Sequence, residues 1–408
     1  MKKLREIISG QSSLVFADQL IFSGSNFLLT FLLARKLNIS DFGYFSGILL
    51  STYLLVGISN SILVQPFQIM SAKNFDKKAL GFVFQASLLL MLIFVGVLFL
   101  IRFLPFPALI IFRTDILAVI IFIIGYILQD FLRKILLTLG HLKLVIFIDC
   151  LFTVIFPLLF FQKDLSLAGV LFCIGIVNLI ASVPGIFYVL KNASFSLQNR
   201  IYINYHLKEG KWLLSASVVQ WFSNNFFTLI AGVYLGMNAL GALRLVQSFF
   251  GIINIALQTV ENYFLPKLAQ LHYQNRPVEK QDLLKILNKG MFLLGGIIIV
   301  IFIFSQYFIV LIGGEKYEAY GFVIRLISVL YIIIICGYST RISIRVLEQN
   351  KAFFVGYCIS FVFSLLTFHF LLKYFGLYGA VSGLVMNQTL MIIYWKILLN
   401  KKNISVWA

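Results

Sequence analysis

The stretch FLLTFLLARKLNISDFGYFS, residues 27–46, decides how this chain folds. An apolar run ends at Arg35 and Lys36, the polar break Asn-Ile-Ser-Asp follows, and a second apolar run begins at once. Two apolar helices joined by so short a break form a hairpin, and the charged pair at its corner can stay at the lipid–water interface. The stretch therefore predicts two adjacent membrane-crossing helices.

Apolar residues dominate the whole chain as well as this stretch. Of its 408 residues, 61% are hydrophobic, 43 are phenylalanine and only 12% are charged. Soluble globular domains carry about 25% charged residues, and a bilayer accommodates apolar runs of about 20 residues that a soluble core cannot hide. The composition excludes a soluble protein. The runs also lack the alternation of barrel strands, which leaves an all-α polytopic membrane protein.

The apolar runs and the charged breaks between them predict twelve membrane-spanning helices. The predicted spans cover residues 12–34, 42–70, 79–101, 114–135, 142–161, 165–190, 209–235, 240–265, 286–312, 319–344, 351–372 and 376–399. The last two spans are joined so tightly that a count of eleven also fits.

Lysine and arginine predict the orientation of these spans. With twelve spans, the N-terminus, the even-numbered loops and the C-terminus share one side, which holds 24 of the 33 basic residues. Because cytoplasmic loops are enriched in these residues, both termini are expected in the cytoplasm. The net charge of +18 is spread over many loop ends, so no nucleic-acid partner is expected.

The sequence contains no motif for a metal, a cofactor or a nucleotide. Four cysteines are scattered singly, and no CxxC, HExxH, Walker A, GxGxxG or GxSxG pattern occurs. We therefore expect no cofactor, no metal site and no catalytic residues. Energy would come from ion gradients or from the concentration difference of a transported molecule.

An internal repeat relates the two halves of the chain. A shift of 198 positions superposes the opening hairpin on residues 224–246, NNFFTLIAGVYLGMNALGALRLV. The shift matches Asn26 with Asn224, Thr30 with Thr228, Leu37 with Leu235 and Gly43 with Gly241. The sequence therefore predicts an N-terminal six-helix half over 1–190, a cytoplasmic linker over 191–208 and a C-terminal six-helix half over 209–408.

The segment ARKLNISDFGYFSG, residues 34–47, resembles the first-hairpin signature of the polysaccharide-transporter and O-antigen flippase branch of the multidrug/oligosaccharide-lipid/polysaccharide exporter superfamily. A basic residue and Leu end the first helix, and Phe-Gly-Tyr follows a polar break. LGMNALGALRLV, residues 235–246, is similar to the second-half echo, and span count and length agree over essentially the whole chain.

The resemblance implies a MATE-like fold and a place in the bacterial cytoplasmic (inner) membrane. It implies a flippase for an undecaprenyl-pyrophosphate-linked oligosaccharide, such as the O-antigen repeat unit used in lipopolysaccharide biosynthesis. The lipid-linked oligosaccharide and membrane lipids would then be its partners, with a polysaccharide polymerase as a further candidate.

One face of the predicted eighth span, residues 240–265, is polar. At 100° per residue, this face holds Arg244, Gln247, Gly251, Asn254, Gln258, Glu261 and Asn262, while the opposite face is apolar. Such a stripe cannot face hydrocarbon, where its hydrogen bonds would stay unmade. It either lines a water-filled cavity or forms polar contacts between helices, and we favour the cavity.

Two other spans carry similar polar groups. Ser217, Gln220, Asn224 and Thr228 share a face of the seventh span, and Gln11, Asp18, Ser25, Asn26 and Thr30 share a broader face of the first. The superposed Asn26 and Asn224 place equivalent groups in both halves, as a central cavity between parallel repeats requires.

Three arginines lie in the outer parts of predicted spans or at their outer ends, namely Arg35, Arg244 and Arg325. A guanidinium is a planar fork that suits phosphate and carboxylate oxygens, so these side chains are candidates for binding a pyrophosphate or an acidic sugar. Alternatively, each arginine pairs with a carboxylate or with a lipid phosphate.

Acidic residues within the spans are candidates for ion coupling, above all Asp18 and Glu261. A carboxylate in a low dielectric can titrate near neutral pH, so exchange of H⁺ or Na⁺ could bias which side is open. In the alternative, Arg133 neutralises Asp18. Asp130 and Arg133 are one turn apart and are expected to pair with each other.

Two other functions remain open at this stage. The first is a small-molecule or drug antiporter of the same superfamily, which would favour carboxylates and aromatic rings over arginines in its cavity. The second is a polytopic glycan polymerase or glycosyltransferase, which would require a long external loop, whereas every predicted outer loop is short.

Overall fold

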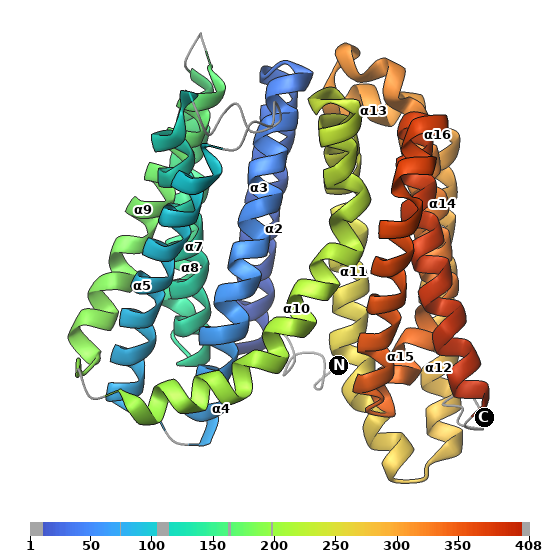
Figure 1. The fold of residues 1–408 in the computed structure, drawn as a ribbon. Coiled ribbons are helices and arrows are strands. Elements are labelled where there is room, and N and C mark those ends of the chain that lie inside the picture. Colours follow the sequence, from blue (N-terminus) through green and yellow to red (C-terminus); the bar gives the residue numbers. More distant parts are fainter. Residues whose placement is uncertain (1–10, 74, 104–113, 162–164, 197–198, 402–408) are drawn as a thin grey trace. The chain divides into compact units, whose positions relative to one another are not determined.

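The computed structural model describes residues 11–73, 75–103, 114–161, 165–196 and 199–401 (Figure 1). The regular elements in these residues are helices, which form two compact units, Met1–Val218 and Val219–Ala408. The ends of the predicted halves, residues 1–10 and 402–408, lie outside the described part. The predicted boundary at 191–208 stays a prediction, and the two units divide inside a single helix.

The opening hairpin folds as its sequence predicts. Helix α2 (Gln11–Lys36) ends with its two basic residues, which interact favourably with the negative C-terminal end of the helix dipole. Two residues separate it from helix α3 (Ile39–Ser59), and the Asn38 side chain caps α3 by accepting a 2.7 Å hydrogen bond from the Asp41 N–H. The corner is therefore fixed by local chemistry.

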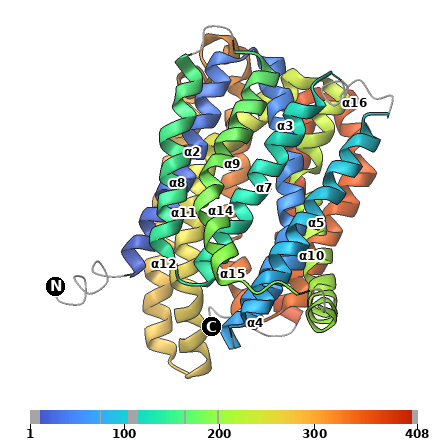
Figure 2. The same cartoon turned by 90° about the vertical axis from the view of Figure 1, so that its left-hand side faces the viewer.

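The first unit continues with further helices. These are a π-helix η1 (Asn60–Val64), α4 (Gln65–Lys73), α5 (Lys77–Ile101), α7 (Ile116–Thr138), α8 (Leu142–Ile155), a 3₁₀ helix η3 (Phe156–Phe161), α9 (Leu167–Asn192) and the first half of α10 (Arg200–Leu235). Helix α7 is central: it packs along α9 and also contacts α3, α5 and α8 (Figure 2). Gly125 and Gly175 let the α7 and α9 backbones approach closely.

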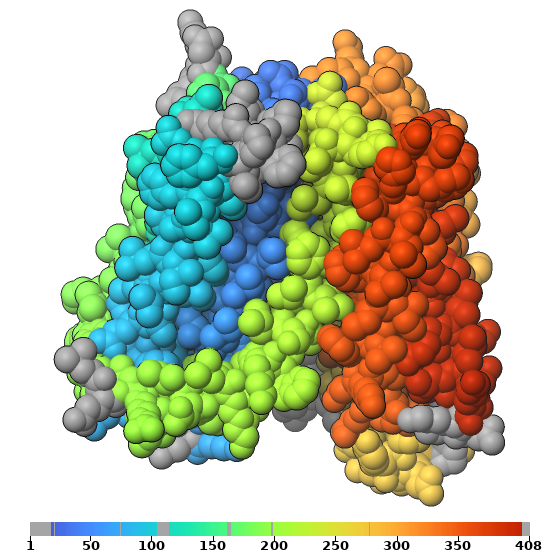
Figure 3. Space-filling model, viewed as in Figure 1, coloured from blue at the N-terminus to red at the C-terminus, as the bar shows by residue number. Residues whose placement is uncertain are grey.

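The start of α10 lies across one end of the first unit, exposed along its outer side (Figure 3). Pro66 has no N–H, so the carbonyl of Ile62 lacks its ordinary helical donor. His206 of α10 supplies that donor: its Nδ1 lies 2.8 Å from the Ile62 oxygen. Nearby, the Tyr202 hydroxyl donates a hydrogen bond to Asp76. These two contacts hold the α10 start in place.

The second unit comprises the end of α10 and six further helices with one 3₁₀ turn. These are α11 (Met237–Tyr273), α12 (Pro277–Ile303), α13 (Ser305–Gly313), η4 (Glu315–Tyr320), α14 (Gly321–Cys336), α15 (Tyr338–Val346) and α16 (Asn350–Lys401). Gly236, with φ of 98°, turns the chain from α10 into α11. The 198-residue shift carries Asn38 onto Gly236, so both hairpin corners fall at equivalent positions.

Aromatic packing stabilises the second unit where the first and last segments of α16 meet. Trp395 is fully buried, stacks on Phe353 with ring centroids 5.2 Å apart, and donates its indole N–H to the Ala352 oxygen at 3.1 Å. Farther along α16, Gly376 has φ 52° and ψ −129°, which breaks the helix between the two tightly joined spans predicted for this region.

Nine helices in the described residues are long and apolar enough to cross a membrane. One of them is the continuous run Ile39–Lys73, and another is α16, whose 52 residues contain the break at Gly376. Helices α2 and α10, which are 26 and 36 residues long, are not among the nine. The structure thus supports a multi-pass helical membrane protein, while twelve spans and cytoplasmic termini stay predictions.

Candidate functional site

A polar cavity of about 350 Å³ lies within the second unit. Helices α10, α11, α14, α15 and α16 all contribute to its wall. The lining residues are Ser223, Asn224, Asn225, Arg244, Gln247, Asn254, Leu257, Gln258, Glu261, Ile327, Leu330, Tyr331, Ile334, Tyr338, Arg341, Leu384, Asn387 and Gln388. A cavity with so many amide and charged groups suits a hydrophilic ligand rather than a hydrocarbon.

The polar face of α11 supplies the longest side of this cavity. The structure brings together the predicted Arg244, Gln247, Asn254, Gln258 and Glu261, which recur at three- and four-residue steps along one helix. Within this row, the Arg244 guanidinium donates to Gln247 Oε1 at 3.2 Å. Two members of this row are therefore hydrogen-bonded to each other without a ligand.

The amide of Gln247 also connects the two hairpin helices. Its Nε2 donates to the Thr228 hydroxyl on α10 at 2.7 Å. The hydrogen bond fixes the direction of the amide and leaves the Arg244 side chain beside it at the cavity wall.

The other end of the cavity carries a cluster of opposite charges. The Glu261 carboxylate is 7% exposed and lies 3.7 Å from a guanidinium nitrogen of Arg341, and it also contacts Arg345. Both arginines come from α15, which follows a helix break at Gly337. Two guanidinium groups against one carboxylate leave a local excess of positive charge, which favours an anionic ligand.

Amide and hydroxyl groups complete the wall where α10 meets α16. Asn387 donates its amide to the Ser364 hydroxyl at 2.7 Å and to the Ser223 oxygen at 3.3 Å. Ser223 in turn donates to the Ser360 hydroxyl at 3.0 Å. Because these buried groups already have partners, this part of the wall is rigid.

Three residues of the sequence prediction lie outside the cavity lining in the second unit. Gln220 of α10 donates to the Tyr357 hydroxyl at 3.3 Å. Arg325 of α14 donates through Nε to the Ser305 hydroxyl at 2.8 Å. Asn262 is exposed on α11 and does not line the cavity. The structure does not bring Gln220 and Arg325 together with the α11 row, and their predicted substrate contacts stay predictions.

Two further predicted residues belong to the first unit. Asn26 is half-buried on α2, where its amide donates to the Phe22 oxygen of its own helix at 2.8 Å. Arg35 is exposed at the end of α2. A role of either residue in substrate binding stays a prediction.

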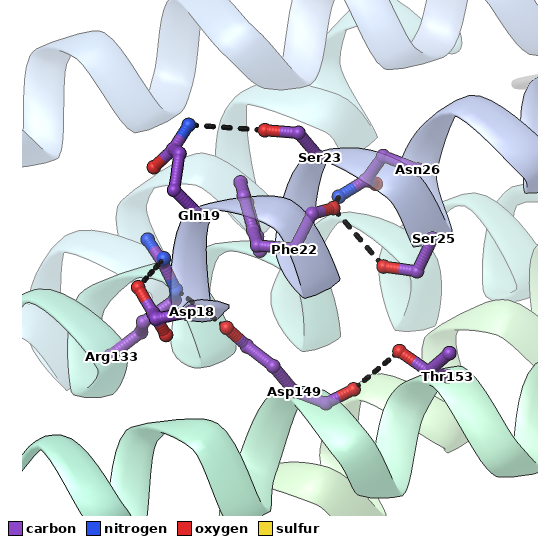
Figure 4. Close-up of polar contacts among 9 residues, drawn as sticks. All are labelled: Asp18, Gln19, Phe22, Ser23, Ser25, Asn26, Arg133, Asp149 and Thr153. Atoms are coloured by element: carbon purple, nitrogen blue, oxygen red, sulfur yellow. Dashed lines mark hydrogen bonds and ion pairs between the residues drawn. The ribbon is translucent and has the colours of Figure 1, made fainter. Parts of the chain in front are cut away.

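A buried charge cluster joins three helices of the first unit (Figure 4). Arg133 of α7 donates to Asp18 of α2 at 2.5 Å and to Asp149 of α8 at 2.9 Å. All three side chains are at most 7% exposed, and the guanidinium also lies 4.1 Å from the centre of the Phe22 ring. The formal charge of the cluster is −1 when both carboxylates are ionised.

The expected Asp130–Arg133 pair is wrong. Asp130 pairs instead with Lys134 at 2.8 Å, one turn along the same helix. Arg133 points toward α2 and α8, where it contacts Asp18 and Asp149. The alternative in which Arg133 neutralises Asp18 agrees with the structure, and Asp149 is a second partner that the sequence did not reveal.

Several residues at the cavity were missed by sequence reasoning. Arg341 and Arg345 counted only as basic residues of a loop end, although their four-residue spacing on a helix could have placed both on one face. Asn387 and Gln388 are isolated amides in an apolar run. Tyr338 gives no sequence signal, because a tyrosine in a membrane helix is common.

Three solved structures illustrate which proteins share this fold. An inward closed conformation of the lipid II flippase MurJ has a TM-score of 0.71 and 14% identity, over 95% of this chain and 87% of that chain. An inward-facing multidrug resistance MATE family transporter of the MOP superfamily has a TM-score of 0.68 and 13% identity, over 97% of this chain and 96% of that chain.

The third is a MOP superfamily transporter from Pyrococcus furiosus described by a reverse polarity of its binding pocket. Its TM-score is 0.57 at 13% identity, over 96% of this chain and 92% of that chain. No family profile and no curated protein matches the sequence. The chain therefore has the fold of MurJ and of MATE proteins, which are transporters and not enzymes.

Proposed function

We propose that this protein is a flippase that moves an undecaprenyl-pyrophosphate-linked oligosaccharide across the bacterial cytoplasmic membrane by alternating access. The surface-polysaccharide repeat unit is the substrate class, with O-antigen as one example. A polysaccharide polymerase is the partner that would use the delivered unit. The proposal combines the hairpin signature at residues 34–47 with the fold shared with a lipid II flippase.

The cavity of the second unit carries the proposal. A hydrophilic headgroup would find amides along α11 and a guanidinium at Arg244, with a second guanidinium at Arg341. Hydrogen bonds to charged groups contribute about 1.5–3 kcal/mol each, enough to compensate for part of the water that a pyrophosphate loses. A cavity built for apolar drugs would need few of these groups.

The buried cluster of the first unit is our candidate for energy coupling. In the described part of the chain, neither Asp18 Oδ1 nor Asp149 Oδ1 has a hydrogen-bond partner, although both atoms are buried. Two carboxylates that share one guanidinium can take up one H⁺ or Na⁺ and become neutral as a group. Exchange of this cation across the membrane would bias which side is open. Glu261 is the corresponding candidate in the second unit.

A drug or small-cation antiporter is the second candidate function. It is favoured by the TM-score of 0.68 with a multidrug resistance MATE transporter and by the buried carboxylate of Glu261 in the cavity. The excess of arginine over acidic groups around Glu261 argues for an anion instead. A cationic substrate would be repelled by two nearby guanidinium groups.

Deletion of the gene, followed by complementation, tests the proposed function. Without the protein, undecaprenyl-linked glycan should accumulate at the cytoplasmic face while surface polysaccharide disappears. Complementation with Arg341→Gln should leave flipping reduced by about tenfold or more, because the loss of a charged hydrogen bond costs at least about 1.4 kcal/mol. Normal export after deletion would contradict the proposal.

Arg276→Gln is the matched control for this test. Arg276 is an exposed arginine of the same unit and pairs with Glu279 at 3.2 Å on the surface. The control should restore export fully, with an amount of protein in the membrane equal to that of Arg341→Gln. If export of a cationic drug, and not of glycan, depended on Arg341, the second candidate would replace the first.

A further inference from the structure

A second, apolar hollow lies beside the polar cavity of the second unit. It has a volume of about 420 Å³ and lies between α12 on one side and α14 with α15 on the other. Its lining includes Met291, Phe292, Ile299 and Ile332. Phe292 is 85% exposed, so the hollow is open to the surroundings of the unit.

Two adjacent glycines give the hollow its depth. Gly295 and Gly296 line it from α12, and a Cβ added at either position would meet nothing within 4 Å. Glycine inside a helix costs about 0.5–1 kcal/mol relative to alanine, so this pair does not stabilise the helix. It leaves space along an otherwise bulky apolar wall.

The hollow and the polar cavity share one wall. Tyr331 and Ile334 of α14 face the cavity, whereas Ile332 and Ile335 of the same helix line the hollow. Tyr338, just past the end of α14, lines both spaces.

Tyr338 is held in this position by its hydroxyl, which donates to the Leu257 oxygen of α11 at 2.5 Å. One turn farther along α15, Arg341 lines the cavity and lies 3.7 Å from Glu261. Charged and apolar binding surfaces are thus one side chain apart.

We propose that the hollow binds the hydrocarbon tail of an amphiphile whose anionic headgroup occupies the polar cavity. This inference rests on the proposed function, since it assigns a site to the lipid part of the same substrate. The tail is surrounded by hydrocarbon whether it is bound or free, so burial from water contributes little. The hollow adds affinity because it holds the tail next to an already bound headgroup, as a second linked contact does.

Ligand binding to the purified protein in detergent tests this site with two probes. The probes are inorganic pyrophosphate, which has only the headgroup, and undecaprenyl pyrophosphate, which has headgroup and tail. Gly296→Leu fills the hollow. It should weaken the binding of undecaprenyl pyrophosphate about tenfold while leaving the binding of inorganic pyrophosphate unchanged. Arg341→Gln should weaken both probes.

Gly290→Leu is the matched control. Gly290 lies on the same helix, has equally open space around it and does not line the hollow. It should bind both probes as the wild type does. Gly295→Leu is a second filling variant and should repeat the result of Gly296→Leu.

The outcomes separate the two proposals. Unchanged binding of undecaprenyl pyrophosphate in both filling variants, with both probes weakened by Arg341→Gln, would overturn the tail site and leave the proposed function intact. Unchanged binding of both probes in Arg341→Gln would contradict the headgroup site itself. Weaker binding of inorganic pyrophosphate in both filling variants would also overturn the tail site, because the hollow would then affect the headgroup alone.

Discussion

At the scale of single residues, Arg133 shows how one side chain can organise a membrane unit. It joins α2, α7 and α8 through Asp18 and Asp149, which are 115 and 16 positions away in sequence. Removing one member of a buried charge cluster lowers the stability of the protein by more than the intact cluster adds to it, because the remaining charges stay buried without compensation. The cluster is therefore a point of high sensitivity in the first unit.

We expect Arg133→Gln to destabilise the protein by about 3–5 kcal/mol, since it leaves two buried carboxylates facing each other. Thermal unfolding in detergent, followed by size-exclusion chromatography, measures the effect. Lys134→Gln is the control: Lys134 pairs with Asp130 at 2.8 Å one turn away and is partly exposed, so the loss should be below about 1 kcal/mol. Equal melting temperatures for the two variants would contradict a structural role of the cluster.

His206 predicts a pH dependence outside the membrane-spanning segments. Burial lowers the pKa of this histidine, and a T-shaped contact with Phe82 at 5.2 Å surrounds it further with apolar groups. Since burial holds its folded pKa below the unfolded value of about 6.5, the packing of neutral His206 in this apolar site contributes fully to stability above pH 6.5. The contribution is lost as the pH falls through the folded pKa.

Hydrogen exchange at the start of α10, measured between pH 7.5 and pH 5, should therefore show loosening of this segment in acid. His206→Asn keeps a donor for the Ile62 oxygen but does not titrate, so its exchange at this segment should change less with pH. The same acid-induced loosening in both proteins would assign the effect to a group other than His206. The neighbouring Asp76 does not compete with His206 in this pH range, because the Tyr202 hydrogen bond and the Lys78 backbone N–H lower the pKa of its carboxyl and keep it ionised above pH 5.

At the scale of elements, the sequence predicts what local chemistry determines. The α2–α3 corner follows from a capping residue, the α10–α11 corner from a glycine, and the position of each helix from its apolar run. Contacts between side chains of different helices cannot be predicted in this way, because they depend on which helix faces meet after folding. Arg133 was assigned to the nearest acid along its own helix, yet it turns toward two other helices.

The same distinction holds for the candidate site. The α11 row was predictable because a helix repeats every 3.6 residues and places such side chains on one face. Arg341 and Asn387 lie about 80 and 126 positions beyond Glu261 in sequence, so no local pattern connects them to it. Only tertiary packing brings α15 and α16 to the cavity.

Single cysteines along α11 test whether this row faces water. In a background without the four native cysteines, Gln247→Cys, Asn254→Cys and Gln258→Cys should react with a water-soluble thiol reagent, because thiolates form readily only where water reaches. Ile252→Cys is the control: this side chain is 49% exposed on α11 but does not line the cavity, and it should stay unreactive in membranes. Labelling at Ile252 alone would contradict a water-filled cavity.

At the scale of the whole molecule, charge connects the fold to its membrane. The chain has a net charge of +18, and the predicted topology places 24 of its 33 basic residues on one side. The tight turn at Asn275, with φ of 54°, joins α11 to α12 on that predicted side, where Arg276 and Lys280 follow. The turn at Gly314, with φ of 84°, joins α13 to η4 on the opposite side.

These two turns make the orientation testable. In cells that express the cysteine-free protein, Gln274→Cys should react with a membrane-impermeant maleimide only after the cells are opened, whereas Glu315→Cys should react in intact cells. Both positions are exposed beside a turn, so their accessibility differs only through the membrane. The reverse pattern would place the termini outside, because the predicted topology puts them on the same side as the Asn275 turn. Most basic residues would then lie on the outer surface, against the usual bias. Labelling of both positions in intact cells would instead mean that an even number of crossings, and not the one predicted over residues 286–312, separates the two turns, and the twelve-span arrangement would fail.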